Sequence, residues 1–363
     1  MNYRFDKIAF NSTAKKTPTE SDKEHYIGLE HIDSECLEIT RWGSDVAPIG
    51  EKLIMKKGDV LFGKRRAYQR KLAIAPFDGI FSAHGMVLRP NEEVVDKNYF
   101  PFFMSSDLFM ERAVQISVGG LSPTINWKDL REQEFPLPSL AEQKVLADKL
   151  WAAYRLKESY KKLLAATEEM VKSQFIEMFG TDESTKPLTD FIEISFPGEW
   201  GQEDKDSSGV KVIRTTNFTN NGKLDLSDVV TRDIDSVKVE KKKLSKGDII
   251  LERSGGTNEN PVGRVVYFEE DGVYLFNNFT QLLRCKEGIN SLFIFYSLFN
   301  YYQMNKNVIR SMGNKTTGIQ NLKMDRYWQI PIADVSIERQ KEFESIYRQA
   351  DKSGSVLQYR IAC

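Results

Sequence analysis

The sequence has few cysteines and no long apolar run. Its three cysteines (Cys36, Cys285 and Cys363) stand far apart and are odd in number, so they form neither a disulfide framework nor a zinc-ligand spacing. No apolar segment approaches the roughly 20 residues that a membrane span needs, and residues 1–10 lack the apolar core of a signal peptide. These absences argue against a secreted or membrane protein, and we expect a cytoplasmic one.

Catalytic motifs are also missing. There is no Gly-x-x-x-x-Gly-Lys-Ser/Thr phosphate loop, no Gly-x-Gly-x-x-Gly after a strand and no His-Glu-x-x-His zinc motif. Residues 159–162 match Ser-x-x-Lys only formally, because they fall midway along a helical segment. Among the 52 aspartates and glutamates no pair stands out as acid and base. The sequence therefore predicts a non-catalytic chain that binds no cofactor or metal ion itself.

The bulk composition indicates an ordinary globular protein. With 363 residues, 40% of them hydrophobic and 28% charged, the chain is typical of two or three soluble domains. Its net charge of −1 gives no global sign of nucleic-acid binding. Such binding would depend on a local concentration of positive charge.

An internal repeat predicts the domain organisation. Six short segments of the first half recur in the same order in the second half, at an offset of roughly 190 residues. The pairs are residues 57–62 with 246–251, 86–89 with 281–284, 99–103 with 292–296, 119–125 with 313–319, 135–139 with 330–336, and 142–143 with 339–340. Six matches in register are hard to obtain by chance, and the period is too long for a solenoid. We therefore predict two copies of one domain-plus-helix unit.

Each copy has the pattern of a small α+β domain. A Lys-Gly-Asp turn precedes a short apolar strand, and β-branched segments follow. An aromatic-rich stretch is then typical of a buried helix, over residues 99–109 in the first copy and 292–304 in the second. We predict an α+β fold with two similar domains separated by long helices.

A long helix is expected after each domain. Ser139 and Glu142 form a capping box, no proline or glycine interrupts residues 142–179, and Gly180 is placed to end the helix. The apolar residues keep a heptad-like spacing, broken once by Lys157; they are Leu146, Leu150, Ala153, Tyr160, Leu164, Thr167, Val171, Phe175 and Met178. The second helix carries a matching stripe and returns toward the first domain, so an antiparallel coiled coil is predicted.

The second helix is shorter than the first. Roughly 26 residues (338–363) face roughly 38 (142–179), which at about 1.5 Å per residue leaves about 18 Å unpaired. Antiparallel packing places the uncovered part around Leu146, Leu150 and Trp151, and exposed apolar surface of that kind needs a partner. We therefore expect that the chain is truncated or rearranged here, or that another subunit or self-association covers this end.

The densest cluster of positive charge follows the first apolar strand. It comprises Lys64, Arg65, Arg66, Tyr68, Gln69, Arg70 and Lys71. Arginine and lysine neutralise phosphates, arginine takes guanine edges with two hydrogen bonds, and glutamine takes adenine. An isolated basic run is as often a solvated loop, but here a rigid strand would present it. The second copy has Arg253, Ser254 and Asn258 at this place, so the two domains would read different sequences.

Two further loops recur in both copies. The glycine-rich loops at 117–126 and 311–321 offer backbone amides and hydroxyls for phosphate contacts, with Ser122 in the first and Lys315 and Thr316 in the second. The segments 81–84 and 276–280 contain His84 and Asn278. Connecting turns and an ordinary surface histidine are the competing explanations, and the recurrence favours a DNA-binding role.

Taken together, these segments resemble a known family. The run 58–71 with 77–84, the Pro136-Leu137-Pro138 segment followed by Glu142-Gln143, and the order domain, helix, domain, helix look like the specificity subunits of type I restriction–modification systems. The resemblance covers essentially the whole chain. The corresponding parts are a first target-recognition domain at 1–138, a spacer helix at 139–180, a second target-recognition domain at 181–335 and a short distal helix at 336–363.

The resemblance also implies a function. Such subunits read a bipartite target in double-stranded DNA, one half-site per domain, while the helices fix the gap between the half-sites. They recruit two methyltransferase subunits, which bind S-adenosylmethionine, and restriction subunits, which use ATP. Both cofactors are therefore expected on the partners, and the outer face of residues 142–179 is expected to hold the methyltransferase subunits.

Two alternatives stay open at this point. The chain could be a free-standing sequence-specific DNA-binding adapter, or a coiled-coil scaffold whose two globular heads bind proteins. DNA binding through several phosphates weakens steeply with salt, so salt dependence separates the DNA readers from the scaffold.

Overall fold

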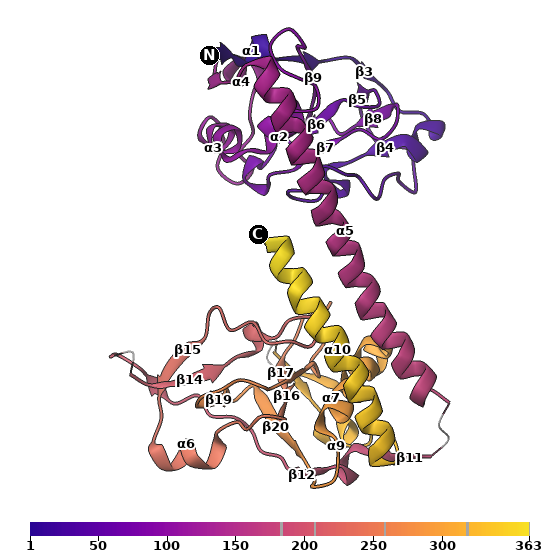
Figure 1. Ribbon diagram of the computed structural model, residues 1–363, viewed down its shortest axis with the longest axis vertical. Helices are drawn as coiled ribbons and strands as arrows, with labels where there is room; N and C mark the ends of the chain where they lie inside the picture. The colour runs from indigo at the N-terminus through magenta and orange to yellow at the C-terminus, as the bar shows by residue number, and fades with distance from the viewer. Residues whose placement is uncertain (182–183, 207, 258, 317–318, 363) are drawn as a thin grey trace. The chain divides into compact units, whose positions relative to one another are not determined.

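The structure is a computed structural model that describes residues 1–181, 184–206, 208–257, 259–316 and 319–362, with the backbone alone described for 315, 316 and 358–362. It divides into two compact units, Met1–Glu158 and Ser159–Cys363. The division falls within the longest helix, α5 (Leu140–Phe179), so each unit contains a part of it (Figure 1). Among the described residues, no helix is both long enough and apolar enough to span a bilayer.

The first unit contains two four-stranded sheets and a group of short helices. The central sheet is antiparallel and has the order β2 (Ala9–Ser12), β9 (Met86–Pro90), β6 (Val60–Phe62), β7 (Leu72–Ile74). The peripheral sheet has the order β3 (Lys15–Lys16), β5 (Lys52–Met55), β8 (Gly79–Phe81), β4 (Tyr26–Ile27). β1 (Asn2–Arg4) pairs with β10 (Glu134–Pro136), and the helices are α1 (Phe5–Ile8), α2 (Phe100–Ser105), α3 (Asp107–Gln115) and α4 (Trp127–Leu130).

The second unit repeats this plan. Its central sheet has the order β12 (Ile192–Ile194), β20 (Thr280–Cys285), β16 (Ile249–Glu252), β18 (Val265–Tyr267), and β11 (Thr185–Pro187) pairs with β23 (Pro331–Ala333). The peripheral sheet contains β13 (Gln202–Glu203), β15 (Val230–Asp233), β14 (Val210–Ile213) and β19 (Tyr274–Phe276). The helices are α6 (Ser236–Lys242), α7 (Ser291–Met304), α8 (Lys306–Met312), α9 (Met324–Tyr327) and α10 (Ile337–Ala362). The predicted α+β fold with two similar domains is confirmed.

The peripheral sheets differ in strand order. In the first unit β5 pairs with β8, whereas in the second unit the corresponding strand β15 pairs with β14. Residues 56–59 join β5 directly to β6, but α6 lies between β15 and β16. The longer connection allows β15 to take a different neighbour. The two units therefore share a central sheet and differ at their outer sheets.

The central strand of each unit is buried on both faces. In β6, Val60 and Phe62 pack into one core and Leu61 into another, and in β16 Ile249 and Leu251 alternate with Ile250 in the same way. Alternate side chains of a strand point to opposite faces, so each central sheet is covered on both sides. A strand held in this way gives the loop that follows it a rigid base.

The recurring Lys-Gly-Asp segments build one ion pair in each unit. Asp59 accepts two hydrogen bonds from the Arg89 guanidinium, at 2.7 and 2.9 Å, and Asp248 accepts two from Arg284, both at 2.7 Å. Each aspartate is almost fully buried. The arginine beside it lies in the neighbouring strand β9 or β20, and the pair raises the pKa of the guanidinium in both units. This part of the repeat is structural.

The recurring glutamines fix the start of each long helix. Gln143 accepts a hydrogen bond from the backbone N–H of Asp96 at 2.8 Å and donates to the carbonyl of Val94 at 3.1 Å. Gln340 accepts from the N–H of Asn290 at 2.9 Å and donates to the carbonyl of Val335 at 3.0 Å. Both amides are buried. The repeated motif thus fixes each helix to its own domain.

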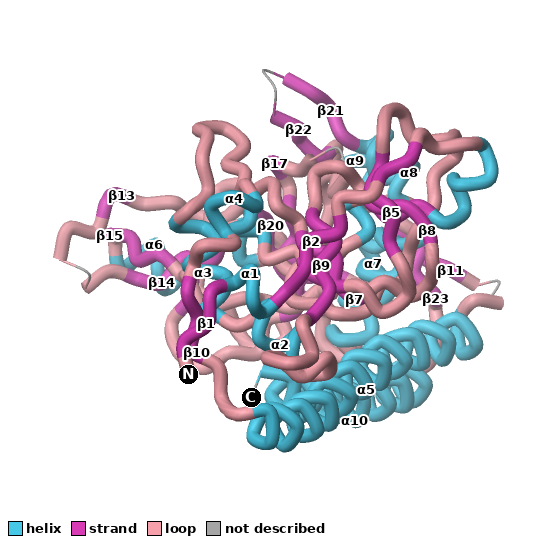
Figure 2. The backbone as a smooth tube through the Cα atoms, turned by 90° about the horizontal axis from the view of Figure 1, so that it is seen from above, coloured by secondary structure: helices cyan, strands magenta, loops and turns pink. Residues whose placement is uncertain are grey.

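The predicted antiparallel coiled coil is present inside the second unit. Phe343 packs against Phe175 and Phe179, with ring centroids 5.0 and 6.0 Å apart, while Gly354 lies against Leu164. A later residue of α10 therefore contacts an earlier residue of α5, which means that the two helices are antiparallel. Figure 2 shows the two helices side by side.

The sequence predicted an uncovered apolar stripe around Leu146, Leu150 and Trp151, and this prediction is wrong for Trp151. Its indole ring packs edge-on against Phe102 at 4.9 Å, and its Nε1–H donates to the carbonyl of Asn98 at 3.0 Å. The heptad spacing correctly indicated an apolar face, but the first unit itself covers this part of α5. Leu146 stays 38% exposed.

The aromatic helix predicted at 99–109 is two helices. α2 ends at Ser105, and Ser106 leaves helical geometry before α3 begins. The Ser106 hydroxyl then caps α3 by accepting a hydrogen bond from the N–H of Phe109. The second unit has the long helix expected there, α7.

Candidate nucleic-acid interface

In the first unit the three candidate loops meet where β6 ends. The carbonyl of Lys64 accepts a hydrogen bond from the N–H of Ile125 at 2.9 Å, and the N–H of Arg66 donates to the carbonyl of Pro123 at 2.7 Å. A Cβ added to Gly85 would lie 2.9 Å from the carbonyl oxygen of Phe62, so the 81–85 loop also passes against this end of the strand. Three segments that are distant in the sequence therefore form one surface.

The second unit joins the same three loops at the end of β16. The carbonyl of Phe279 accepts from the N–H groups of Arg253 and Ser254, at 2.8 and 2.9 Å, and the carbonyl of Arg253 accepts from Leu322 N–H at 2.8 Å. β17 (Ser254–Gly255) pairs with β22 (Ile319–Leu322), and β22 forms a hairpin with β21 (Gly313–Thr316) (Figure 2). The arrangement is the same in both units although the side chains differ.

The predicted residue-by-residue pairing of the two glycine-rich loops, 119–125 with 313–319, is wrong by three residues. Sequence similarity pairs Ile125 with Ile319, but Ile125 and Leu322 are the residues that donate to the carbonyl after the central strand. Ile125 and Leu322 are also both buried. The repeated glycines mark the two loops but do not fix the register of the strand that bonds to the residue after the central strand.

Three residues of the basic run brace the loop itself. Arg70 binds the carboxylate of Asp107 at 2.7 Å and the carbonyl of Ser105 at 3.0 Å, and its Nε lies 3.4 Å from the carboxylate of Glu35. Lys71 donates to the carbonyl of Leu29 at 2.6 Å, and Arg66 donates from Nε to the hydroxyl of Ser122 at 3.1 Å. Arg66 and Arg70 both have left-handed backbone angles, with φ of 56° and 51°.

Left-handed backbone is unfavourable for arginine and persists only where surrounding contacts impose it. The contacts of Arg66 and Arg70 do this, and they hold the short turn η3 (Ala67–Gln69) between the two residues. The loop is therefore a fixed structure. Because Arg66, Arg70 and Lys71 are engaged in these contacts, part of the positive charge of residues 64–71 serves to hold the loop.

The remaining residues of the run face solvent. Arg65 is exposed, Tyr68 is 55% exposed, and Gln69 and Lys64 are half-buried. Within the described part of the chain neither Lys64 nor Arg65 has an ion pair. Burial and the nearby ammonium group of Lys15 lower the pKa of Lys64. Cations without a carboxylate partner, one partly buried and one exposed, are suited to bind an anion such as a DNA phosphate.

Lys15 is a residue that the sequence reasoning missed. It lies in β3 of the peripheral sheet, whereas the corresponding strand of the second unit is Gln202–Glu203. Its only signal in the sequence is the Lys15-Lys16 pair, about 50 residues before the basic run. The fold brings the two together.

The second unit presents fewer cations and more neutral polar groups. Arg253 takes the position of Lys64, and the hydroxyl of Ser254 is buried against Asn321 at 2.7 Å. Asn278 is exposed, as is His84 at the corresponding loop of the first unit. Asn258 lies outside the described residues, and for Lys315 and Thr316 the structure describes only backbone in β21.

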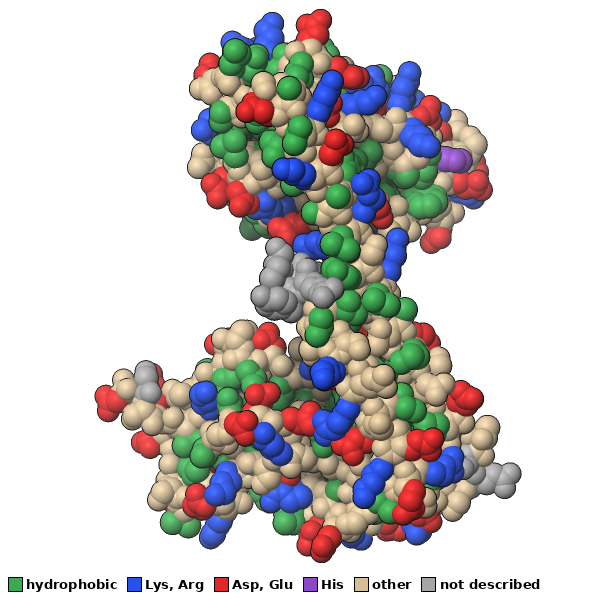
Figure 3. Space-filling view, viewed as in Figure 1, with side chains coloured by type: hydrophobic (Ala, Val, Ile, Leu, Met, Phe, Trp, Pro, Cys, Tyr) green, Lys and Arg blue, Asp and Glu red, His purple; other side chains and the backbone are tan. Residues whose placement is uncertain are grey.

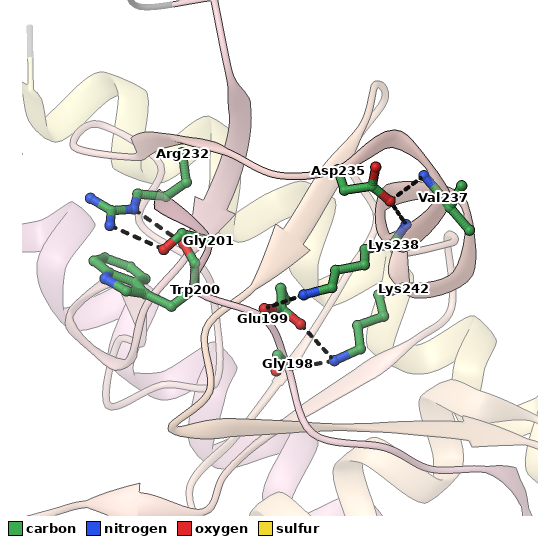
Figure 4. A network of polar contacts seen from close by, with 9 residues as sticks. All are labelled: Gly198, Glu199, Trp200, Gly201, Arg232, Asp235, Val237, Lys238 and Lys242. Carbon is green, nitrogen blue, oxygen red and sulfur yellow. Dashed lines mark hydrogen bonds and ion pairs between the residues drawn. The ribbon is translucent and has the colours of Figure 1, made fainter. Parts of the chain in front are cut away.

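Asn278 borders a hollow of about 540 Å³ that also includes Trp200 and Lys238. Figure 4 shows how its rim is fixed: Lys238 and Lys242 bind Glu199 at 3.3 and 3.2 Å, and these cations lower the pKa of Glu199. The Arg232 guanidinium stacks on Trp200 at 4.3 Å. Much of the positive charge near α6 is therefore neutralised within the unit.

Charge over the rest of the surface is mixed. On the face shown in Figure 3, lysine and arginine side chains are interspersed with aspartate and glutamate in both units. Among the described residues, no group of three or more histidine, cysteine, aspartate or glutamate side chains is placed to hold a metal ion. The two loop surfaces are thus the clearest candidate sites for a polyanionic ligand.

Comparison with protein families gives one match over most of the chain. Residues 10–169 and 182–354 match the type I restriction modification DNA specificity domain. The specificity subunit of the type I restriction enzyme EcoDI from Escherichia coli is 28% identical over 142 residues, which is 39% of this chain and 31% of that protein. The specificity subunit of the type I enzyme StySPI from Salmonella potsdam is 28% identical over 127 residues, 35% of this chain and 26% of that protein. The matches span about a third or less of the length of these relatives.

Solved structures show the same fold. A type I restriction–modification S subunit from M. genitalium aligns over 100% of this chain and 92% of its own, with a TM-score of 0.61 and 14% identity. A chain from a structure that describes complex assembly and conformational transition of the type I R-M system aligns over 99% of this chain and 92% of its own, with a TM-score of 0.53 and 15% identity.

Proposed function

This chain belongs to the type I restriction–modification DNA specificity family, and from this membership we propose that it reads a bipartite DNA sequence, one half-site with each unit. The observation that carries the proposal is the loop surface built twice. In both units three loops meet at the end of the buried central strand: backbone hydrogen bonds join all three in the second unit and two in the first, where the third packs against the strand end at Gly85. A duplicated scaffold with the same loop positions supports two readers of the same kind.

The unequal side chains support an asymmetric target. The first surface offers Lys64, Arg65 and Tyr68, and the second offers Arg253 and Asn278. Arginine and lysine hold phosphates or guanine edges, whereas asparagine suits adenine. We expect the first half-site to be bound with the stronger dependence on salt.

We assign the chemistry to partner subunits. Two methyltransferase subunits that bind S-adenosylmethionine would modify adenine, and restriction subunits that use ATP would cleave DNA. The α5 helix offers them a surface: Leu163 and Met170 are seven residues apart, so they lie on one side of the helix, and they are 52% and 47% exposed. Asparagine at both positions should weaken methyltransferase association and leave DNA binding by the free chain unchanged.

The test of DNA reading uses two arginines of the same loop. The target is first identified by mapping methylated adenines in cells that carry the chain and its partners. Binding to that target is then measured over a salt series for Arg65→Ala and Arg70→Ala. Arg131→Ala is the control, because Arg131 is an exposed arginine of the same unit that pairs with its neighbour Glu132.

Arg65→Ala should weaken binding through the first half-site only and reduce the slope of log K against log salt by about 0.9 for each phosphate that the arginine neutralises. Arg70→Ala should also weaken that half-site, but by loosening the loop, so its thermal stability falls as well. DNA binding that does not depend on salt, or an equal loss at both half-sites from Arg65→Ala, would contradict the two-reader function. Absence of DNA binding with partners present would favour a protein scaffold.

A further inference from the structure

A fully exposed leucine lies at the tip of the first unit's glycine-rich hairpin. Leu121 is 97% exposed, and Val118 at the base of the hairpin is 57% exposed. Single exposed apolar residues are common on protein surfaces and carry no meaning by themselves. The surroundings of Leu121 indicate a role for it, because the hairpin is fixed, Leu121 is the large side chain at its tip, and the hairpin adjoins Lys64 and Arg65.

The hairpin is held at both of its strands. Val118 and Thr124 exchange backbone hydrogen bonds at 3.1 and 2.9 Å, and buried Ile125 donates to the carbonyl of Lys64. The N–H of Arg66 donates to the carbonyl of Pro123. Residues 119–122 are therefore presented from a rigid base, next to the loop that carries Lys64 and Arg65.

The tip presents few side chains that could hydrogen-bond to bases. Gly119 and Gly120 have none, the Ser122 hydroxyl accepts from Arg66, and the Thr124 hydroxyl donates to the carbonyl of Ser122 at 3.1 Å. Leu121 is the one large side chain that the tip presents. The tip therefore offers DNA mainly an apolar contact, through Leu121.

The cations next to the hairpin fit the backbone of the same ligand. Arg65 forms a β-bridge with Thr124, so the arginine lies beside the hairpin strand, and Lys64 precedes it. Phosphate contacts fix the register of a protein on DNA. The major groove of B-form DNA admits a two-stranded ribbon, so a hairpin bordered by such contacts is suited to enter it.

We propose that Leu121 reads a thymine in the half-site of the first unit by contact with its C5-methyl group. The methyl group is the apolar feature that base pairs present in the major groove, and contact with it distinguishes thymine from cytosine and the purines. This inference rests on the proposed function. In the second unit the corresponding tip falls at 317–318, outside the described residues, so the assignment concerns the first unit.

The experiment removes the methyl group and the leucine in a double-mutant cycle. Thymines of the first half-site are replaced one at a time by uracil, which lacks the C5-methyl group and keeps the same hydrogen-bonding edge. Affinity is measured for the wild-type chain and for Leu121→Ala, with partners present if the complex requires them. Ile49→Ala is the matched control, because Ile49 is 95% exposed in the same unit.

One uracil should weaken binding of the wild-type chain about three- to fivefold, the effect of removing one methyl group from an apolar interface. Leu121→Ala should weaken binding to the thymine target by a similar factor and should be insensitive to that uracil. Leu121→Met should retain most of the discrimination, and Ile49→Ala should behave like the wild type. Because Leu121 is exposed, none of these variants should lose stability.

Three outcomes would overturn the inference. Uracil effects that are equal in wild type and Leu121→Ala mean that the leucine does not touch the methyl group. A 2-aminopurine signal that shows unstacking with wild type but not with Leu121→Ala indicates insertion between base pairs instead. Weaker methyltransferase association with unchanged discrimination indicates that Leu121 binds a protein. In each case wild-type preference for the first half-site persists, whereas its absence would contradict the proposed function itself.

Discussion

Phe343 offers the sharpest test of how α10 is held. Its side chain is 0% exposed, and its ring lies 5.0 Å from Phe175, 4.9 Å from Tyr296 and 6.0 Å from Phe179. These rings come from α5 and α7, so Phe343 joins both helices to α10. Phe343→Ala removes the ring from a closed aromatic cluster. A buried phenylalanine replaced by alanine costs about 3–5 kcal/mol.

Hydrogen exchange resolved by peptide is the suitable assay, because it reports the opening free energy of each segment. Since about 1.4 kcal/mol corresponds to a factor of ten, exchange in β16 and β20 should accelerate about 10²- to 10⁴-fold. The strands β6 and β9 of the first unit should keep their rates. Val356→Ala, on the same helix and 49% exposed, is the control and should change stability by less than about 0.5 kcal/mol.

Two results would refute this reasoning. An acceleration of less than tenfold in the second unit would mean that α10 is not part of its core. Equal acceleration in the first unit would mean that the two units unfold together and that the division at residues 158 and 159 has no energetic basis.

Two further predictions concern single buried groups. Gln143→Met and Gln340→Met each leave one buried backbone N–H without an acceptor, so each should destabilise its own unit by about 1–3 kcal/mol in urea unfolding followed by peptide-resolved exchange. Methionine keeps the side-chain volume, so the change tests the hydrogen bonds alone. A loss of stability in the opposite unit would contradict the view that each glutamine stabilises its own unit. Burial raises the pKa of Cys285 to about 12, and the thiolate is the reactive form, so iodoacetamide at pH 8.5 should modify Cys285 roughly a thousandfold more slowly in the folded protein than in urea. Because the folded-state pKa is raised, the corresponding stability is present below the ordinary thiol pKa and is lost as the pH rises toward 12. Rapid labelling of the native protein, followed by mass spectrometry of the peptide, would contradict the burial of this thiol.

Local patterns predicted much of the fold correctly. The repeat indicated two copies, and the structure has two units with the same central sheet. The capping box at Ser139 and Glu142 forms as expected, with the hydroxyl and the carboxylate each bonded to the other residue's backbone N–H. The helix spacing correctly indicated an antiparallel pair. The family suggested by the motifs is confirmed by the match over 10–169 and 182–354.

The candidate DNA-binding residues stay predictions, and the structure divides them. Composition marks Lys64 to Lys71 as one basic run, but the side chains of Arg66, Arg70 and Lys71 are bonded within the unit, whereas among the described residues those of Lys64 and Arg65 have no ion pair. No sequence spacing distinguishes these residues, because Asp107 and Ser122 reach the loop from distant parts of the chain. Leu121 has no signal in the sequence for the same reason, since exposure at a loop tip depends on what packs beside it.

What the sequence determined by itself is local or periodic: the duplication, the short apolar runs that become β6 and β16, the capping of α5 and the spacing of its apolar face. These follow from side-chain periodicity and backbone propensity within a short window. Tertiary structure alone decided the three-residue shift between the hairpins, the different neighbours of β5 and β15 and the cover over Trp151. Each of these depends on hydrogen bonds or packing between segments far apart in the chain, and a local pattern leaves such pairings undetermined.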